Sequence, residues 1–380
     1  MMKPKVIFIA TVQSHIVAFH LPYLEAWHRQ GYEVHVATNQ KNKTEKSENA
    51  KKNHEYIIWH QIDFQRNPLA LDNWKAYRQL ENLMRKETYL LMHLHTPTAS
   101  LISRLVARNF PTTKVVYTAH GFHFYQGAPW KNWLIYYPIE KYLARYTDAI
   151  ITMNAEDYQI AKAKFTTRTK AGVYHVNGVG IDLSYYHSQL DNVATLRQNL
   201  GLAMEDFVIA VVAELIPRKN HWQIIQAIQA MHAEYPDIKV LIVGKGELAE
   251  RYQKEVEKLQ LQKNLIFLGY RQDIPEILQL SDCVGLFSIQ EGLPRNVMEA
   301  MAMGKPLIVT NIRGCIDLVE DEKQGYVVGV HDIEATTQAL KKMYHHRDRS
   351  DLGQNSKIKI KNYQIENVLE QVNTIYQNVL

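Results

Sequence analysis

The stretch "SIQEGLPRNVMEAMAMGKPLIVT", residues 288–310, contains the features that decide both the fold and the chemistry of this chain. A Gly-Leu-Pro break separates Glu291 from Glu299. On one continuous helix the two carboxylates would point about 80° apart, because each residue turns the helix by roughly 100°. Pro294 suits the first turn of a helix and Gly304 suits its end. We therefore predict a strand, a loop that carries Glu291, and a helix that begins near Pro294.

Length and composition indicate a globular chain of roughly two to three domains. Of the 380 residues, 46% are hydrophobic and 22% are charged, which allows a sizeable core. The two cysteines, Cys283 and Cys315, have no C-x-x-C spacing, so we expect neither a disulfide framework nor a zinc cluster. This cysteine usage fits a protein of the reducing cytoplasm. The apolar run at the N-terminus is too short for a secretory signal, and no apolar stretch is long enough to span a membrane.

The charge is unevenly distributed along the chain. Residues 1–188 hold 23 Lys and Arg against 14 Asp and Glu, a net +9, which leaves −4 for residues 189–380. A basic half suggests an anionic partner, either nucleic acid or a membrane surface. The basic residues are dispersed and no zinc-finger or RNP-like pattern occurs, so we predict a membrane surface and no nucleic acid.

Apolar, β-branched runs alternate with helical patterns along the whole chain, which predicts parallel sheets covered by helices on both faces. Strands are expected at residues 5–11, 32–38, 90–96, 114–120, 149–154, 172–177, 207–214, 238–244, 264–269, 283–288, 306–310 and 325–328. Two such sets imply two doubly wound domains joined by the polar stretch 187–206. The polar, Lys-rich residues 39–55 are predicted to be a flexible loop. A helical tail ends the chain.

Positive charge follows the first strand of the second half, where Arg218 and Lys219 stand in "AELIPRKNH". Ligands of open α/β sheets bind beyond the carboxyl ends of the strands. The amides of residues 292–296 form an anion site at a helix start, and the two cations can neutralise a diphosphate. Glu291 and Glu299 cannot bind phosphate but can bind hydroxyl groups. The pattern predicts a nucleotide sugar, and the chain has no Asp-x-Asp pair to hold a metal.

These motifs together resemble the retaining glycosyltransferases of family 4, which have the GT-B fold: α/β, with two doubly wound Rossmann-like domains facing a central cleft. The motifs are "EGLPRNVME" at 291–299, "PRKN" at 217–220, "GKGE" at 244–247 and "HVNGVGID" at 175–182. Residues 10–27 and 118–148 further resemble bacterial members that build capsule, exopolysaccharide or O-antigen. The resemblance implies an acceptor-binding domain at 1–188 and a nucleotide-sugar-binding domain at 189–363. A helix at about 364–380 can pack back on the first domain.

The resemblance also implies roles for single residues. Glu299 would bind the ribose hydroxyls and Glu291 the donor sugar, while Lys219 with Arg218 would bind the diphosphate. Further donor contacts are implied at Gly292, Leu293, Pro294, Asn296, Gly244 and Ser14. The catalytic set would be His120, Glu291 and Lys219.

Other positions match the family less closely. His120 would face the donor sugar across the cleft, and Tyr270 with Arg271 would contact the base. Many members carry Arg where this chain has Glu214. A glycine-rich loop usually follows the first strand, where this chain has "TVQSHI", with Ser14 as the nearest match.

The implied reaction moves a hexose or N-acetylhexosamine from a nucleotide sugar, with UDP expected, to a lipid-diphosphate-linked glycan. Retention would follow front-face attack, in which the leaving phosphate deprotonates the acceptor. Glu291 as a covalent nucleophile is the less favoured route. We expect no cofactor and no metal; His93 and His95 share a strand face but show no convincing metal-ligand context.

Residues 122–146 contain nine aromatic residues interleaved with cations. We predict a surface that approaches lipid headgroups through Trp130, Lys131, Trp133, Lys141 and Arg145, and a peripheral location at the cytoplasmic face of a bacterial plasma membrane. A core helix with a few exposed rings is the alternative.

Two other functions stay open at this point. One is a GT-B sugar-nucleotide 2-epimerase, which needs no membrane surface. The other is a non-catalytic partner subunit of a glycosyltransferase complex. A nicotinamide oxidoreductase is disfavoured because the first strand–helix turn lacks G-x-G-x-x-G.

Overall fold

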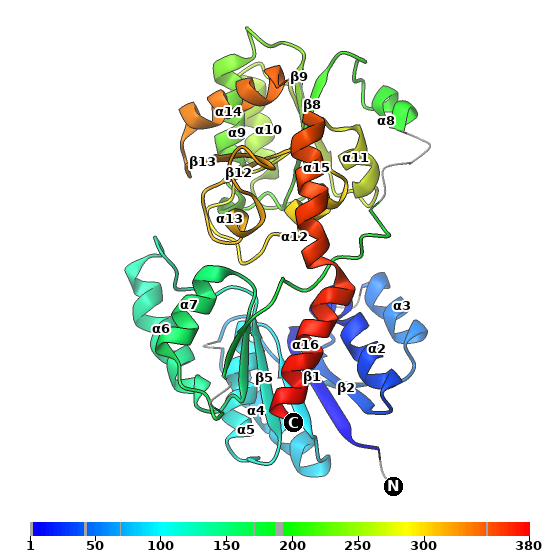
Figure 1. Cartoon of the computed structure of the whole chain (residues 1–380), viewed down its shortest axis with the longest axis vertical. Helices are drawn as coiled ribbons and strands as arrows, with labels where there is room; N and C mark the ends of the chain where they lie inside the picture. The colour runs from blue at the N-terminus through cyan, green and yellow to red at the C-terminus, as the bar shows by residue number, and fades with distance from the viewer. Residues whose placement is uncertain (1–2, 42–43, 69, 170–171, 187–192, 347–348) are drawn as a thin grey trace. The chain divides into compact units, whose positions relative to one another are not determined.

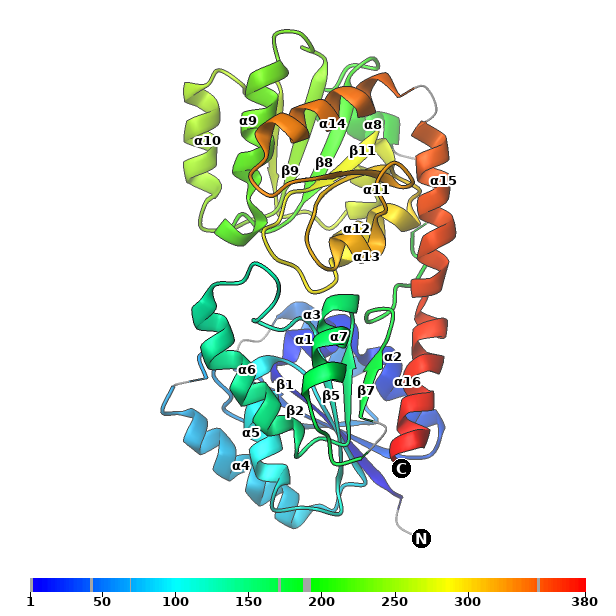
Figure 2. The same cartoon turned by 60° about the vertical axis from the view of Figure 1, so that its left-hand side comes forward.

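The computed structural model describes residues 3–41, 44–68, 70–169, 172–186, 193–346 and 349–380. The chain divides into two compact units, residues 1–180 with 366–380 (unit 1) and residues 181–365 (unit 2). Each unit contains one parallel sheet with helices on both of its faces (Figures 1 and 2). The predicted α/β class with two doubly wound sheets is therefore confirmed.

Unit 1 has a seven-stranded sheet in the order β3-β2-β1-β4-β5-β6-β7. Its strands are β1 Lys5–Val12, β2 Glu33–Asn39, β3 Ile57–Gln61, β4 Leu91–Leu94, β5 Lys114–Ala119, β6 Ala149–Thr152 and β7 Val173–His175. The strand order reverses between β1 and β4, and this switch point is where doubly wound sheets place ligands.

The helices of unit 1 cover both faces of that sheet. They are α1 Gln13–Phe19, α2 Leu21–Arg29, α3 Glu45–Asn53, α4 Asn73–Lys86, α5 Pro97–Ala107, α6 Trp130–Ala144, α7 Ala155–Lys164 and α16 Ile365–Val379. Ile7 and Ile9 of β1 pack with the buried side chains of α4 and α5. On the opposite face, Tyr376 of α16 packs on Trp27 of α2, with 4.9 Å between ring centroids. The C-terminal helix therefore completes the core of unit 1.

Unit 2 has a six-stranded sheet in the order β10-β9-β8-β11-β12-β13. Its strands are β8 Phe207–Val212, β9 Ile238–Val243, β10 Leu265–Gly269, β11 Cys283–Leu286, β12 Leu307–Thr310 and β13 Gly325–Val328. Its helices are α8 Val193–Asn199, η1 Pro217–Lys219, α9 His221–Met231, α10 Ala249–Lys258, α11 Ile274–Leu280, α12 Arg295–Ala302, α13 Cys315–Leu318, α14 Ile333–His345, α15 Arg349–Ile360 and η2 Lys361–Tyr363.

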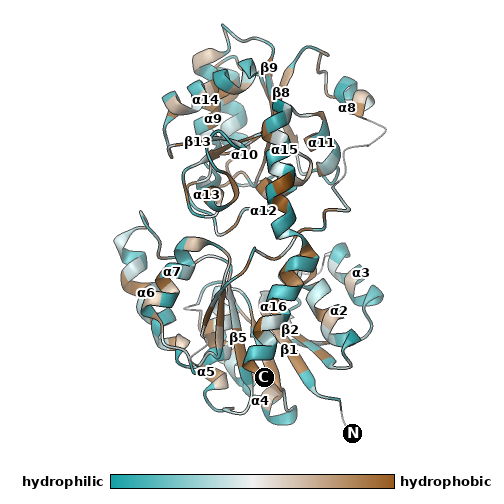
Figure 3. Ribbon diagram, viewed as in Figure 1, coloured by the Kyte–Doolittle hydropathy of each residue, from teal (hydrophilic) through white to brown (hydrophobic). Residues whose placement is uncertain are grey.

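The strands are apolar on both faces because both faces are covered. In β1, six consecutive residues are buried, and the apolar colouring of the strands against polar outer helix faces is visible in Figure 3. Burial of each large aliphatic side chain contributes about 1.5–3 kcal/mol. Among the described residues, no helix is both long and apolar enough to cross a bilayer.

One local prediction was wrong, and one strand was not predicted. Within the expected loop 39–55, residues 45–53 form α3, because Thr44 and Ser47 make a reciprocal capping box that satisfies the first amides of a polar helix. Strand β3 was missed because it lies at the sheet edge and only Ile57 in it is buried. Part of the predicted junction 187–206, residues 187–192, lies outside the described residues.

Candidate active site

The two cations predicted to bind phosphate lie in one turn at the carboxyl end of β8. Arg218 and Lys219 belong to η1, and Asn220 ends the turn in the left-handed conformation with φ 49°. The side-chain amide of Asn220 donates to the carbonyl of Phe287, at 3.1 Å. The amide of Ile289 donates to the carbonyl of Arg218, at 2.8 Å. These bonds hold the turn beside the loop that follows β11.

Glu291 lies in that second loop and accepts three side-chain hydrogen bonds. Lys219 Nζ lies 2.6 Å from Oε1 and Arg218 Nη1 lies 3.0 Å from Oε2. Ser288 Oγ donates to Oε1 at 2.7 Å. The side chains of Glu291 and Lys219 are 9% and 13% exposed, while that of Arg218 is 42% exposed. The bond to Lys219 is therefore the better shielded of the two ion pairs.

A third cation, Arg313, follows β12 and contacts the same loop. The guanidinium Nε of Arg313, which is buried, donates to the carbonyl of Glu291 at 3.1 Å. The next residue, Gly314, has φ 76°, and a Cβ there would lie 2.3 Å from the carbonyl oxygen of Gly292. Only glycine allows this approach. Two cations thus pair with the Glu291 carboxylate, while Arg313 holds the backbone of the same residue.

The helix after this loop starts where the sequence predicted. Helix α12 begins at Arg295 with Pro294 as its cap residue. Its Glu299 accepts from Tyr186 Oη at 2.8 Å and from Arg295 Nε at 3.2 Å. Burial raises the pKa of Tyr186, and the Glu299 carboxylate raises it further, so the phenol stays a hydrogen-bond donor.

Two other residues predicted to bind the donor, Asn296 and Gly244, hold the surrounding loops together. Asn296 Nδ2 donates to the carbonyl of Val212 at 2.7 Å, which ties the start of α12 to the end of β8. Gly244 has φ 152°, and a Cβ there would lie 2.0 Å from the carbonyl oxygen of Ala213, so glycine is required where the loop after β9 packs on the loop after β8.

Tyr270 and Arg271 follow β10, two strands away from β8. Tyr270 is exposed and Arg271 Nε donates to Asp273 Oδ1 at 2.8 Å. Ser14 and His120 belong to unit 1, where Ser14 is exposed in the first turn of α1 and His120 follows β5.

The predicted membrane residues lie on or next to α6. Trp130 is 68% exposed, and Lys131, Lys141 and Arg145 are also exposed. Trp133 is a correction: its indole N–H donates to the carbonyl of Tyr125 at 3.1 Å, and its ring packs on the core of unit 1. The exposed apolar surface of α6 instead includes residues that the sequence did not single out, namely Leu134, Ile135, Ile139 and Tyr142.

Three residues of the site were missed at the level of sequence. Arg313 follows the strand β12, so its position at a carboxyl end was an available signal. Ser288 ends the β11 strand pattern and looked like an ordinary strand residue. Tyr186 directly precedes the polar junction 187–206, and no local pattern marks it.

Comparison with known proteins gives the class. Residues 5–154 match the family model described as "Glycosyl transferase 4-like", and residues 192–359 match "Glycosyl transferases group 1". The chain therefore belongs to the GT-B glycosyltransferases, with a 4-like N-terminal domain and a group 1 C-terminal domain.

Several relatives extend over most of the chain. The putative glycosyltransferase EpsD of Bacillus subtilis is 36% identical, over 90% of this chain and 88% of that one. The UDP-Gal:alpha-D-GlcNAc-diphosphoundecaprenol alpha-1,3-galactosyltransferase of Escherichia coli is 30% identical, over 82% and 81%. The structure of HepE from Anabaena in complex with UDP and glucose superimposes with a TM-score of 0.80 at 18% identity, over 99% and 100%. At that identity the structural likeness supports the fold.

Proposed function

We propose that the chain transfers a hexosyl or N-acetylhexosaminyl group from a UDP-sugar to a lipid-diphosphate-linked glycan during bacterial surface polysaccharide synthesis. The observation that carries the proposal is the pairing of Lys219 and Arg218 with Glu291 at the carboxyl ends of β8 and β11. The galactosyltransferase from Escherichia coli, whose name gives a UDP-sugar donor and a lipid-diphosphate acceptor, supports this choice of substrates.

The charge balance of the site suits a diphosphate. Glu291 is the counter-ion of Lys219 and Arg218 in the free protein. A diphosphate that takes over both cations would release the Glu291 carboxylate, which can then accept hydrogen bonds from hydroxyl groups of the donor sugar. Donor binding would in this way exchange one anion for another without leaving a buried cation unpaired.

Glu299 is suited to the nucleoside. Tyr186 and Arg295 both donate to its Oε1, which fixes the orientation of the carboxylate. The remaining acceptor positions can take the two ribose hydroxyls, since a carboxylate has about four lone-pair sites.

The proposed reaction uses these contacts as follows. The bond between the anomeric carbon and the diphosphate oxygen breaks, a bond from the acceptor oxygen to the same carbon forms, and the acceptor proton passes to the leaving diphosphate. Lys219 and Arg218 stabilise the charge that develops on the leaving group, a role that needs no metal. Attack on the face that the diphosphate leaves retains the anomeric configuration. The alpha linkage in the name of the Escherichia coli relative supports retention, because common UDP-hexoses are alpha-linked.

Unit 1 supplies the acceptor side of the proposal. A pocket of about 310 Å³ lies at the carboxyl ends of β1 and β4 and is lined by residues that include Arg66, His123 and Tyr136. Ser14 and His120 lie near the same edge of the sheet and keep the roles that the family implies, Ser14 in binding the donor and His120 in catalysis. The exposed α6 surface would rest on anionic lipid at the cytoplasmic face of the membrane.

The transfer is tested by incubating the protein with radiolabelled UDP-hexoses and a synthetic lipid-diphosphate GlcNAc, in EDTA, and by determining the anomeric configuration of the product. Transfer with an alpha product, lost in Lys219→Ala, Glu291→Ala and Glu299→Ala but kept in the exposed control Glu257→Ala, supports the proposal. A beta product overturns retention, and epimerisation of the donor without acceptor indicates the 2-epimerase instead.

The membrane surface is tested separately by cosedimentation with anionic vesicles. Trp130→Ser combined with Leu134→Ser should release the protein, while Trp74→Ser, which removes another exposed tryptophan of unit 1, should not. Equal binding by both variants would exclude α6 as the contact.

A further inference from the structure

Four histidines of unit 1 converge at the switch point of its sheet. His15 lies in α1 and His20 directly follows it, His95 follows β4, and His120 follows β5. One ring nitrogen from each lies within 4.8 Å of all the others. We call this set the four-histidine cluster. Because β1, β4 and β5 are neighbours in the sheet, their carboxyl ends bring together three segments that are far apart in sequence.

The contacts inside the cluster cannot all be hydrogen bonds. His15 Nε2 lies 3.2 Å from His120 Nε2 and 3.3 Å from His20 Nε2, and His120 Nε2 also lies 3.4 Å from His95 Nδ1. Each ring nitrogen has one in-plane position, occupied by either a proton or a lone pair. His15 Nε2 and His120 Nε2 each face two nitrogens, so at most two of the three contacts can be satisfied as hydrogen bonds.

The same spacing suits a metal ion. Zinc–nitrogen bonds of about 2.0–2.1 Å in a tetrahedron place neighbouring nitrogens roughly 3.3–3.4 Å apart. Three of the six nitrogen separations in the cluster, at 3.2, 3.3 and 3.4 Å, lie close to this value. Neutral imidazole is a preferred ligand of zinc, cobalt, nickel and copper.

The cluster is shielded from solvent on one side and accessible on the other. His20 and His95 are buried. His15 and His120 are half-buried, which leaves a route for an ion to enter. Among the described residues, Nε2 of His95 has no hydrogen-bond partner, so that ring is not held by a complete neutral network.

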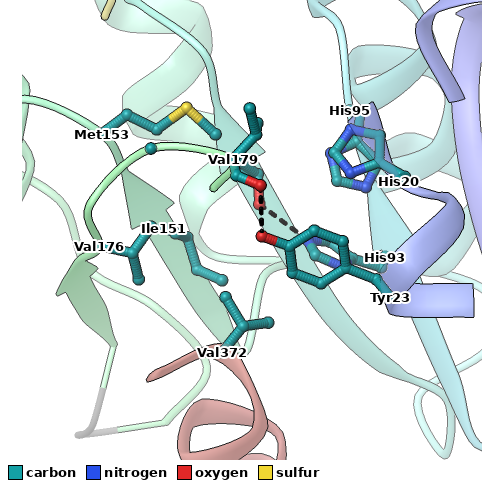
Figure 4. A pocket seen from close by; sticks show the side chains of 11 residues that line it. His20, Tyr23, His93, His95, Ile151, Met153, Val176, Val179 and Val372 are labelled. Carbon is teal, nitrogen blue, oxygen red and sulfur yellow. Dashed lines mark hydrogen bonds between the residues drawn. The ribbon is translucent and has the colours of Figure 1, made fainter. Parts of the chain in front are cut away.

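We propose that the four-histidine cluster binds one divalent transition-metal ion of the zinc class. His20 and His95 stack with 3.7 Å between ring centroids, above a small pocket that Tyr23 and His93 also line (Figure 4). Binding would rotate these two rings so that both lone pairs face the ion. His93 is not a ligand, because Tyr376 Oη and Thr118 Oγ1 occupy its two nitrogens at 2.6 and 2.7 Å.

The site is independent of the proposed donor chemistry. Its ligands belong to unit 1, whereas Lys219 and Glu291 belong to unit 2. Transfer in EDTA and metal binding can therefore both be true, or each can fail alone. With the ion bound, Nε2 of His120 is a ligand and Nδ1 is the nitrogen that remains for a sugar hydroxyl.

The test is a titration of the untagged, metal-free full chain with Co²⁺, followed by competition with Zn²⁺. We expect one Co²⁺ per chain with the intense visible absorption of tetrahedral coordination, displaced by Zn²⁺. His95→Gln and His15→Gln should each weaken binding by at least the roughly 10–100-fold that is lost when a supporting residue of a metal site is removed. His60→Gln is the matched control, since His60 pairs with His35 elsewhere in the sheet at 2.9 Å.

Two ligand variants are used because a variant that does not fold would lose metal binding whether or not the replaced histidine is a ligand. His15 is half-buried, so His15→Gln should keep the thermal unfolding temperature of the parent even if His95→Gln does not fold. Binding that survives in a folded His15→Gln variant, absorption typical of octahedral Co²⁺, or equal weakening in His60→Gln would overturn the proposal.

Discussion

Replacing Glu291 by glutamine should lower the free energy of unfolding of the ligand-free protein and increase its affinity for UDP. The carboxylate is the counter-ion of Lys219 at 2.6 Å and of Arg218 at 3.0 Å. Glutamine keeps the shape but loses the charge, so both cations are left without their partner in the free state. A diphosphate would then bind them without first displacing an anion.

The size of the expected stability loss depends on how exposed the paired side chains are. Removing one partner of a buried ion pair costs about 3–5 kcal/mol, and an exposed pair is worth about 0–1 kcal/mol. Lys219 and Glu291 are mostly shielded whereas Arg218 is 42% exposed, and glutamine still accepts a hydrogen bond. We expect a loss of about 2–3 kcal/mol, which lowers the unfolding temperature of a unit of this size by roughly 5–10 °C. The affinity for UDP should rise about 3–10-fold, which corresponds to about 0.7–1.4 kcal/mol.

The assay combines thermal unfolding with calorimetric titration of UDP, using Lys219→Ala for comparison and Glu257→Gln as the control. Lys219→Ala removes a charge-assisted bond to phosphate of about 1.5–3 kcal/mol and should weaken UDP binding about 10–150-fold. Opposite signs for the two variants are the key expectation. If Glu291→Gln weakens UDP binding as Lys219→Ala does, or leaves the unfolding temperature unchanged, Glu291 is not the counter-ion that the diphosphate replaces.

Three other changes test the surroundings of the site. Tyr186→Phe removes a hydrogen bond that orients Glu299, so the dissociation constant for UDP should rise about 3–10-fold, and an unchanged constant would exclude a role for that bond. Gly314→Ala places a Cβ 2.3 Å from a carbonyl oxygen at φ 76°, which should cost about 1–3 kcal/mol of stability and loosen UDP binding; Gly201→Ala, with φ 68° and open space, controls for backbone strain alone. Burial lowers the pKa of His221 to about 4, against 6.5 in the unfolded chain. Between pH 6.5 and pH 4 the unfolded state therefore binds a proton that the folded state does not, and the free energy of unfolding falls by about 1.4 kcal/mol for each pH unit. Both of its nitrogens lack partners among the described residues, so His221→Leu should reduce the loss between pH 7 and pH 5 by about 2 kcal/mol in denaturant unfolding, and an equal loss in both proteins would contradict this.

The sequence was sufficient for the architecture because buried parallel strands carry their own signal. The run "FVIAVV" is apolar on both faces, and "IKVLIV" is apolar apart from Lys239, as is typical of strands covered on both faces. Where burial is partial the signal fails: β3 lies at an edge, and α3 is so polar that only its Thr44 cap distinguishes it from a loop.

The sequence predicts those site residues that directly follow a strand. Lys219 and Glu291 stood at carboxyl ends and were expected to share a ligand, but nothing in the spacing indicated that they neutralise each other in the free protein. Tyr186 reaches Glu299 from a distant segment, and the four histidines come from three separate segments of the chain. Such contacts depend on which strands become neighbours, and that information is in the topology of the sheet.

The return of α16 has a consequence for how the protein is made. Val368, Val372 and Tyr376 are buried in a unit whose strands come from the first half of the chain. During synthesis unit 1 lacks this helix until residues 366–380 leave the ribosome, so unit 2, residues 181–365, is complete before unit 1 is. Ribosome-bound chains that stop before residue 366 should therefore expose an apolar face around Trp27, a kind of surface that favours aggregation until residues 366–380 cover it.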